Sequence, residues 1–173
     1  HGLYDKRFMY EESFRTPLII SCPSLVKKHS VCKELVQNID LAPTFLSLAG
    51  VEVPKEMSGR SLLPLFKNGK AENWRNELYY HFYDYPAVGS VRKHDGIRTK
   101  RYKLIHWYGE GSGNDEAIDF WELYDLKNDP AEMYNIYGQP GTEEVTAELK
   151  TTLLDLQQQY NDPVRFGPER DKE

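Results

Sequence analysis

Four short runs rich in aromatic and β-branched residues, between residues 78 and 126, constrain the fold more than any other feature of this sequence. They read LYYHFYDYP, GIRT, YKLIHWY and FWELYDL, and the segments that flank them include KR, the glycine-rich GEGSGND and KNDP. Runs of this length that are bounded by turn-forming residues are typical of β-strands. We therefore predict an antiparallel meander of about four strands, in which the many aromatic rings pack across neighbouring strands.

A helix is predicted to follow these strands, over residues 142–160. Thr142 is a candidate N-cap, and the acidic residues Glu143 and Glu144 favour the positive N-terminal end of a helix. The apolar residues recur at helical spacing on one stripe, which consists of Val145, Leu149, Leu153, Leu156 and Tyr160. The helix is therefore expected to pack on the sheet through one face.

The first part of the sequence has a different character. TPLIISCP (residues 16–23) is a continuous apolar run between prolines, which predicts a strand buried on both faces of an α/β sheet. DLAPTFLSLAG (residues 40–50) predicts a helix that Asp40 caps and that buries Leu41, Phe45 and Leu48. The order of elements predicts an α/β portion over residues 1–75 and a unit of sheet plus helix over residues 76–173.

Charge and hydropathy exclude two classes of partner. The formal net charge is -5, and no basic domain is present that would bind the phosphate backbone of a nucleic acid. No apolar run approaches the roughly 18 to 20 residues that cross a bilayer. The two cysteines, Cys22 and Cys32, form neither a zinc-binding pattern nor a C-x-x-C pair.

Common catalytic motifs are also missing, since the sequence contains no G-x-S-x-G, no H-E-x-x-H, no P-loop and no tight cluster of Asp and His for a metal. Two polar segments remain, HGLYDKR and VRKHDGIRTKR. Either could bind an anion through Lys or Arg, or be a charged loop and a turn between strands. His81 is expected to pack among tyrosines, and His106 is expected to have a structural role in a strand.

Several segments, taken together and in order, resemble the type I sulfatases of the alkaline-phosphatase superfamily. Near the N-terminus the matching residues are His1-Gly2, Tyr4-Asp5-Lys6, Met9-Tyr10-Glu11-Glu12 and Arg15-Thr16-Pro17. The later matches are NIDLAPTFLSLAG, MSGRSLLPLF, GIRTKRYKLI and WELYDLKNDPAEMYN. The resemblance implies the C-terminal part of an alkaline-phosphatase-like fold. Residues 1–75 would be a remnant of the large α/β domain, and residues 76–173 the whole smaller domain.

The resemblance also implies roles for individual residues. Lys6 resembles the lysine that binds the sulfate ester, where an ammonium group neutralises charge on the transferred sulfuryl oxygens. His94 resembles a position at which the small subdomain reaches toward the substrate, with Arg92 and Lys93 as weaker companions. His1 resembles the second histidine of the family's paired HG segments, near the pocket.

The family's remaining catalytic groups have no match. Neither cysteine stands in the C/S-x-P-x-R motif that becomes the formylglycine nucleophile, and the calcium-binding aspartates are absent. We therefore expect a C-terminal fragment, cut inside an active-site loop and inactive alone. It would come from an exported sulfatase that acts on a sulfated sugar or glycosaminoglycan. The missing N-terminal portion, or a second copy of the chain, would cover the apolar surface that is exposed where the N-terminal portion is lacking.

Two alternative functions remain open at this point. The parent protein could hydrolyse phosphate monoesters or diesters, since the nucleophile and metal ligands that separate these reactions from sulfate hydrolysis are missing here. The sheet-plus-helix unit could instead be a non-enzymatic module that binds glycans or docks to a partner.

Overall fold

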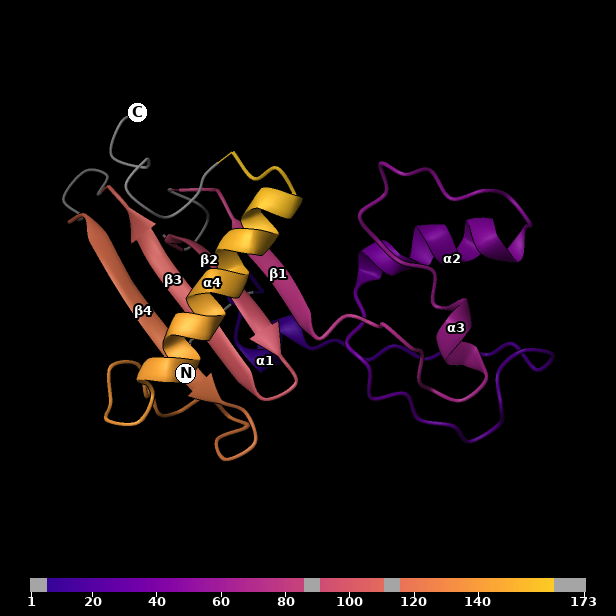
Figure 1. The fold of residues 1–173 in the computed structure, drawn as a ribbon, viewed down its shortest axis with the longest axis horizontal. Coiled ribbons are helices and arrows are strands. Elements are labelled where there is room, and N and C mark those ends of the chain that lie inside the picture. Colours follow the sequence, from indigo (N-terminus) through magenta and orange to yellow (C-terminus); the bar gives the residue numbers. More distant parts are fainter. Residues whose placement is uncertain (1–5, 86–90, 111–115, 164–173) are drawn as a thin grey trace. The chain divides into compact units, whose positions relative to one another are not determined.

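The computed structural model describes residues 6–85, 91–110 and 116–163. The chain divides into two compact units, one formed by His1–Thr16 with Glu77–Glu173 and the other by Pro17–Asn76 (Figure 1). The start of the chain thus belongs to the same unit as its C-terminal half. Among the described residues, no helix combines the length and the apolar character that a membrane crossing needs.

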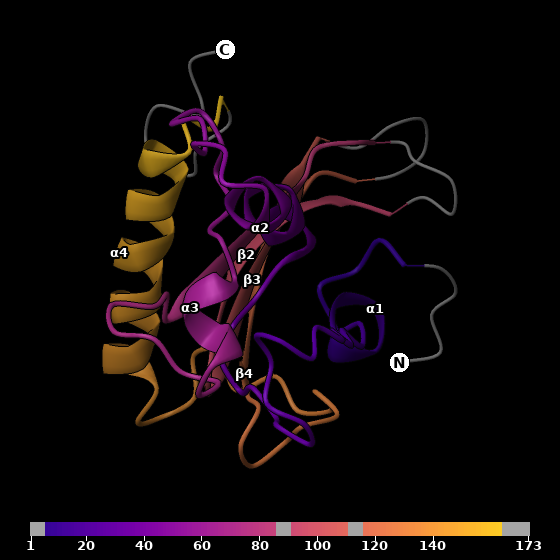
Figure 2. The ribbon, with the colours of Figure 1, turned by 90° about the vertical axis from the view of Figure 1, so that its right-hand side faces the viewer.

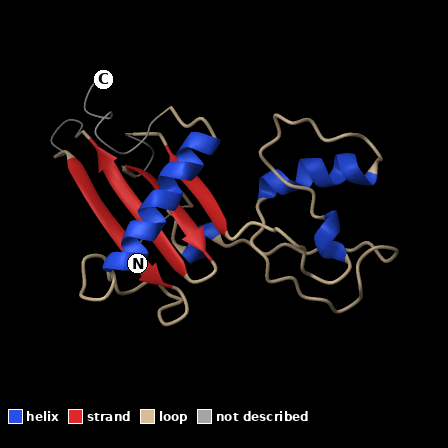
Figure 3. Cartoon of the chain, in the orientation of Figure 1, coloured by secondary structure: helices blue, strands red, loops and turns tan. Residues whose placement is uncertain are grey.

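The first unit contains the predicted four-stranded antiparallel sheet. Its strands are β1 (Glu77–Phe82), β2 (Lys93–Thr99), β3 (Tyr102–Gly109) and β4 (Ile118–Asp125), and they lie side by side in sequence order (Figure 3). The sequence pattern located all four strands, because short runs separated by turns leave each strand beside its predecessor. This sheet and the helix that follows it confirm the predicted architecture of the C-terminal part.

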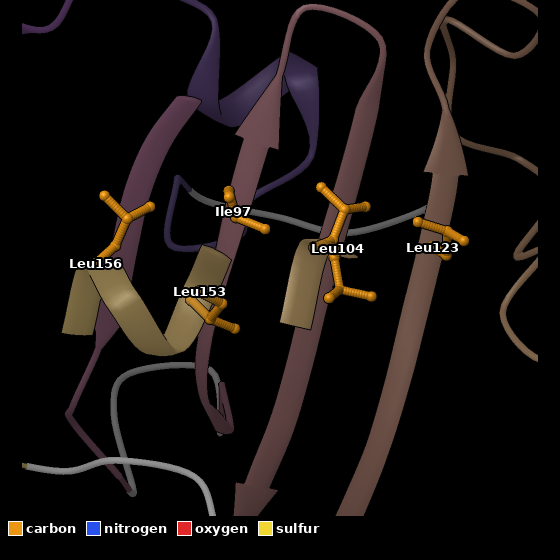
Figure 4. Close-up of a cluster of buried hydrophobic side chains, with 6 residues drawn as sticks. Ile97, Leu104, Leu123, Leu153 and Leu156 are labelled. Carbon is orange, nitrogen blue, oxygen red and sulfur yellow. The ribbon is translucent and has the colours of Figure 1, made fainter. Parts of the chain in front are cut away.

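One face of the sheet packs against α4 (Glu143–Gln159). The buried core between them consists of Ile97, Leu104 and Leu123 from the strands and Leu149, Leu153 and Leu156 from the helix (Figure 4). The predicted apolar stripe is therefore confirmed at its centre. At the C-terminal end of α4, the ring of Tyr160 stacks on that of Tyr79 at 5.8 Å.

The opposite face of the sheet is covered by the N-terminal segment, which includes the short helix α1 (Glu11–Phe14). Figure 2 shows α1 and α4 on opposite sides of the strands. Met9 is fully buried here, against the backbone of Gly96. A Cβ atom at residue 96 would lie 2.7 Å from Met9 Sδ and 2.4 Å from the carbonyl oxygen of Leu104. Only a glycine therefore lets the segment approach β2 this closely.

The second unit is built around a buried ion pair. It contains the short helices η1 (Asn38–Asp40), α2 (Leu41–Leu48) and α3 (Leu63–Phe66). The Asp40 carboxylate accepts two hydrogen bonds of 2.6 Å from Arg75, and one of 2.8 Å from each of the backbone N–H groups of Gln37 and Arg60. These bonds replace the predicted cap, since the Asp40 side chain makes no capping bond to α2.

Two predictions for this unit were wrong. Residues 16–23 do not form a strand, and the side chain of Ile19 is 91% exposed. A strand needs a hydrogen-bonded neighbour, and the described residues of this unit include no strand that could pair with it. The apolar face of α2 is covered only in part, since Leu41 packs against the buried Leu62, Leu65 and Phe66, whereas Phe45 is 65% exposed and Leu48 is 44% exposed.

Candidate functional site

Residues 6–10 follow the face of the sheet that α4 leaves uncovered, and three successive side chains fix their path. The ring of Phe8 lies 6.1 Å from that of Trp107. The side chain of Met9 is fully buried against Gly96. The Tyr10 hydroxyl donates to the Glu122 carboxylate at 3.0 Å. Burial and this carboxylate both raise the pKa of Tyr10, so the hydroxyl remains a donor. The backbone that carries Lys6 is therefore fixed immediately after that residue, while the Lys6 side chain is exposed.

His94 lies beneath this segment, in the middle of an aromatic row that crosses the sheet. Its ring is fully buried, 5.4 Å from that of Phe82 and 4.3 Å from that of Trp107, its partners on the two neighbouring strands. Nδ1 lies 2.9 Å from the carbonyl oxygen of Arg92, so this nitrogen carries the proton of the neutral ring. His94 therefore supports the surface on which the segment rests.

Burial lowers the pKa of His94 to about 4, while the carbonyl groups of Arg92 and Arg7 act in the opposite direction. The ring is thus neutral at physiological pH. Tyr80, whose ring lies 5.7 Å from that of His94, donates a hydrogen bond of 3.4 Å to the Arg7 carbonyl. The structure therefore brings His94 close to the backbone next to Lys6, although it does not expose the His94 side chain.

The other residues singled out in the sequence have different surroundings. Arg92 lies over the ring of Tyr85, with its guanidinium carbon 4.7 Å from the ring centroid, and Lys93 is half-buried at the start of β2. His1 lies outside the described residues. Direct contacts of Lys6, His94 and His1 with a substrate stay predictions.

Sequence reasoning missed a buried charge network beneath the same segment. Lys103, on β3, is fully buried, and its Nζ atom forms ion pairs of 2.9 Å with Glu11 and 2.6 Å with Glu132. Arg98 pairs with Glu11 at 3.1 Å. We call these four residues the Lys103 network. The available signal was weak, because one lysine in YKLIHWY is also typical of a strand with one solvated face.

The two carboxylates of the Lys103 network respond to burial differently. Burial opposes the ionisation of Glu11, but Arg98 and Lys103 outweigh it, so that the pKa of Glu11 is lowered. Burial raises the pKa of Glu132 despite its pairing with Lys103. The paired cations therefore hold Glu11 firmly in its charged form.

A second polar cluster lies on the α4 side of the sheet. Asp162 accepts hydrogen bonds from His81 at 2.6 Å and Tyr83 at 2.8 Å, and also from Tyr79, while the second ring nitrogen of His81 contacts Tyr108. The side chains of His81 and Asp162 are only 2% and 1% exposed. As predicted, His81 packs among tyrosines, and the cluster fastens the end of α4 to β1.

The described residues offer no donor set for calcium. No group of three or more His, Cys, Asp or Glu side chains among them could hold a metal ion. Two of their buried carboxylates are instead paired with cations, Asp40 with Arg75 and Glu132 with Lys103, and Asp162 is hydrogen-bonded to tyrosines and His81. The calcium that the sulfatase resemblance implies therefore does not fit these residues.

Comparison with known proteins supports the resemblance that the motifs indicated. Residues 1–159 match the family model described as N-sulphoglucosamine sulphohydrolase, C-terminal. An N-acetylglucosamine-6-O-sulfatase of Bacteroides thetaiotaomicron is 49% identical over 164 residues, which make up 94% of this chain and 28% of the relative. The multifunctional alkaline phosphatase superfamily protein PehA of Trinickia caryophylli is 34% identical over 152 residues, 81% of this chain and 28% of that protein.

A solved structure has the same fold over the whole chain. It is that of BT4656 in complex with its substrate D-glucosamine-2-N,6-O-disulfate, with a TM-score of 0.87 and 47% identity over 100% of this chain and 33% of that one. The chain thus spans about a third of the length of the proteins that it matches.

Proposed function

Because this chain belongs to the N-sulphoglucosamine sulphohydrolase C-terminal family, we propose that it forms the C-terminal part of a sulfatase, an enzyme that hydrolyses sulfate esters. The observation that carries this proposal is the match along the whole chain to a protein whose solved complex contains a sulfated glucosamine. The 49% identical relative is named for a sulfated N-acetylglucosamine. The substrate is accordingly a sulfate ester on an amino sugar or a glycosaminoglycan.

Lys6 is the sulfate contact that this chain supplies. Its side chain is exposed, whereas the residues that follow it are fixed on the sheet by Phe8, Met9 and Tyr10. An exposed ammonium group on a fixed backbone can meet an anionic ester without a large cost in ordering the chain. His94 contributes indirectly, because its buried neutral ring supports the Arg7 backbone.

The rest of the active site lies outside this chain. Formylglycine as the nucleophile, and calcium, belong to the remainder of the enzyme, so the chain alone is inactive. The same remainder covers the apolar side chains that the Pro17–Asn76 unit leaves exposed, among them Ile19, Val31 and Phe45. Exposed apolar groups of this size mark an interaction surface. A self-associated chain is the alternative occupant of this surface.

An exported parent enzyme, whether periplasmic, secreted or lysosomal, is part of the same proposal, since sulfated glycans are polymers found outside the cytoplasm. The phosphate-ester alternative is less favoured, because the relative that is 49% identical over 164 residues is named as a sulfatase. A purely glycan-binding module is likewise less favoured than part of an enzyme.

The direct test uses the intact parent enzyme with three substrates: N-acetylglucosamine 6-sulfate, N-acetylglucosamine 6-phosphate and the phenyl monoester of phenylphosphonic acid, which releases phenol on hydrolysis. Ion chromatography measures free sulfate and phosphate, and absorbance measures phenol. We expect sulfate release to exceed both other rates by at least about a hundredfold, which corresponds to about 2.7 kcal/mol of transition-state discrimination. Faster hydrolysis of either phosphorus ester would contradict the proposal. Glycan binding without any hydrolysis would support the docking module instead.

A further inference from the structure

We propose that Lys103 and Glu132 are positioning residues, which hold the backbone after Lys6 and thereby set where the Lys6 ammonium group meets the sulfate ester. This inference rests on the proposed function, and it adds two residues that lie far from Lys6 in the sequence. Both belong to the sheet unit, Lys103 on β3 and Glu132 in the connection between β4 and α4.

The first hold is on the carbonyl group of Met9, three residues after Lys6. The buried Lys103 Nζ donates a hydrogen bond to this oxygen, in addition to its ion pairs with Glu11 and Glu132. One ammonium group thus contacts three oxygen-bearing groups, two of which belong to the N-terminal segment. Moving that segment would leave the buried Lys103 ammonium group with Glu132 as its partner but without Met9 and Glu11, which is costly.

The second hold is on the backbone N–H group of Glu11, which donates to the Glu132 carboxylate at 2.5 Å. Glu132 itself has a backbone φ of 54°, in the left-handed region that a residue other than glycine seldom adopts. The conformation costs energy and persists only where the surroundings fix it. Here it directs a carboxylate that is 0% exposed toward Lys103 and Glu11.

The charges of the Lys103 network balance, with Lys103 and Arg98 against Glu11 and Glu132. An apolar cluster of similar volume would often give equal or greater stability, so a buried ionic network is weak evidence for a stabilising role. The ionic groups instead contribute positional specificity, because Lys103 holds the carbonyl group of Met9 and Glu132 holds the N–H group of Glu11. The network therefore suits the task of holding one loop in one place.

The consequence for Lys6 follows from the short connection. Only two residues separate Lys6 from Met9, whose carbonyl group Lys103 holds, so a shift at Met9 displaces the ammonium group. In an active site, a displacement of about 1 Å can cost on the order of a hundredfold in rate. Loss of the Lys103 network should thus lower the rate of sulfate release, although the residues of the network do not contact the substrate.

The test is a double-mutant cycle in the intact parent enzyme. Lys103→Met with Glu132→Met removes the hold on Met9 and the acceptor of the Glu11 N–H group, while leaving the Arg98–Glu11 pair and the balance of charge. We expect kcat/KM for the sulfated sugar to fall about tenfold or more when Lys6 is present. In the Lys6→Ala background the same change should cost less than about twofold, because two residues that act through one group are not additive. Equal losses in both backgrounds would overturn the proposal.

Hydrogen exchange of the Glu11 amide gives a readout that does not depend on activity. We expect this amide to exchange at least about tenfold faster in the Lys103→Met/Glu132→Met variant, which has no side-chain acceptor at residue 132, with the amides of β3 unchanged. Unchanged exchange at Glu11 would overturn the proposal, as would an equal increase throughout the sheet. Arg101→Ala, which breaks the half-exposed pair with Asp125 in the same unit, serves as control and should alter neither readout. An enzyme that releases no sulfate refutes the proposed function, and the Glu11 amide still decides whether the hold exists.

Discussion

At the scale of single residues, His94 couples folding to pH. Its ring is fully buried among aromatic side chains, and burial lowers its pKa from an ordinary 6.5 to about 4. Between these two pH values the unfolded chain binds a proton that the folded protein does not bind. Stability contributed by the neutral ring is therefore present above pH 6.5 and is lost as the pH falls toward 4. The difference corresponds to on the order of 3 kcal/mol.

A His94→Phe variant should remove this part of the pH dependence, because phenylalanine fills the aromatic row without titrating. Urea unfolding of the intact protein at pH 7 and at pH 4.5 measures the effect. We expect the variant to lose less stability between these two pH values than the wild-type protein, by on the order of 2 kcal/mol. Identical losses would show that His94 is protonated in the folded state or is not buried.

Lys6 and Lys103 show how far residue-level prediction from the sequence extends. The prediction for Lys6 came from its place in a series of family motifs, and its position on an exposed loop is compatible with a ligand contact. Lys103 was missed because its partners, Glu11 and Glu132, are 92 and 29 positions away in the sequence. Only the folded sheet brings the three together, and no local pattern predicts a buried lysine.

At the scale of secondary structure, the contact between α4 and the sheet gives a matched pair of variants. Leu153 is fully buried in the core, whereas its neighbour Leu154 is 40% exposed. Leu153→Ala should lower the free energy of unfolding by about 2–5 kcal/mol, because it removes buried methyl groups and leaves a cavity. Leu154→Ala should cost less than about 1 kcal/mol. Urea unfolding of the intact protein measures both values, and similar losses would mean that α4 packs through another face.

The elements that sequence could predict are those whose partners are close in the chain. The four strands and α4 satisfy each other within residues 77–159, so turn signals and helical periodicity were sufficient. The run at residues 16–23 and the apolar face of α2 carry equally clear patterns, but the described residues of their unit cover only part of them, Ile20 and Leu41. An apolar pattern predicts which side chains a segment can bury, and whether they are buried depends on a neighbouring segment that covers them.

At the scale of the whole molecule, one of the two compact units is formed by segments that are far apart in the sequence. The residues up to Thr16 belong to the unit that Glu77–Glu173 forms, while Pro17–Asn76 forms a unit of its own. The proposed sulfate contact is consequently carried by the sheet unit, on the face opposite α4. The predicted division at residue 75 considered only the linear sequence, from which the return of the N-terminal segment to the sheet was not visible.

The central claim is that this chain completes a sulfatase active site through Lys6. Its most direct test is kcat/KM for sulfate release from N-acetylglucosamine 6-sulfate by the intact enzyme carrying Lys6→Ala, with Lys55→Ala, another exposed lysine, as control. We predict a loss of about a hundred- to a thousandfold for Lys6→Ala, as when one charge-stabilising group is removed, with unfolding unchanged. A loss within about twofold of that of Lys55→Ala would contradict the claim.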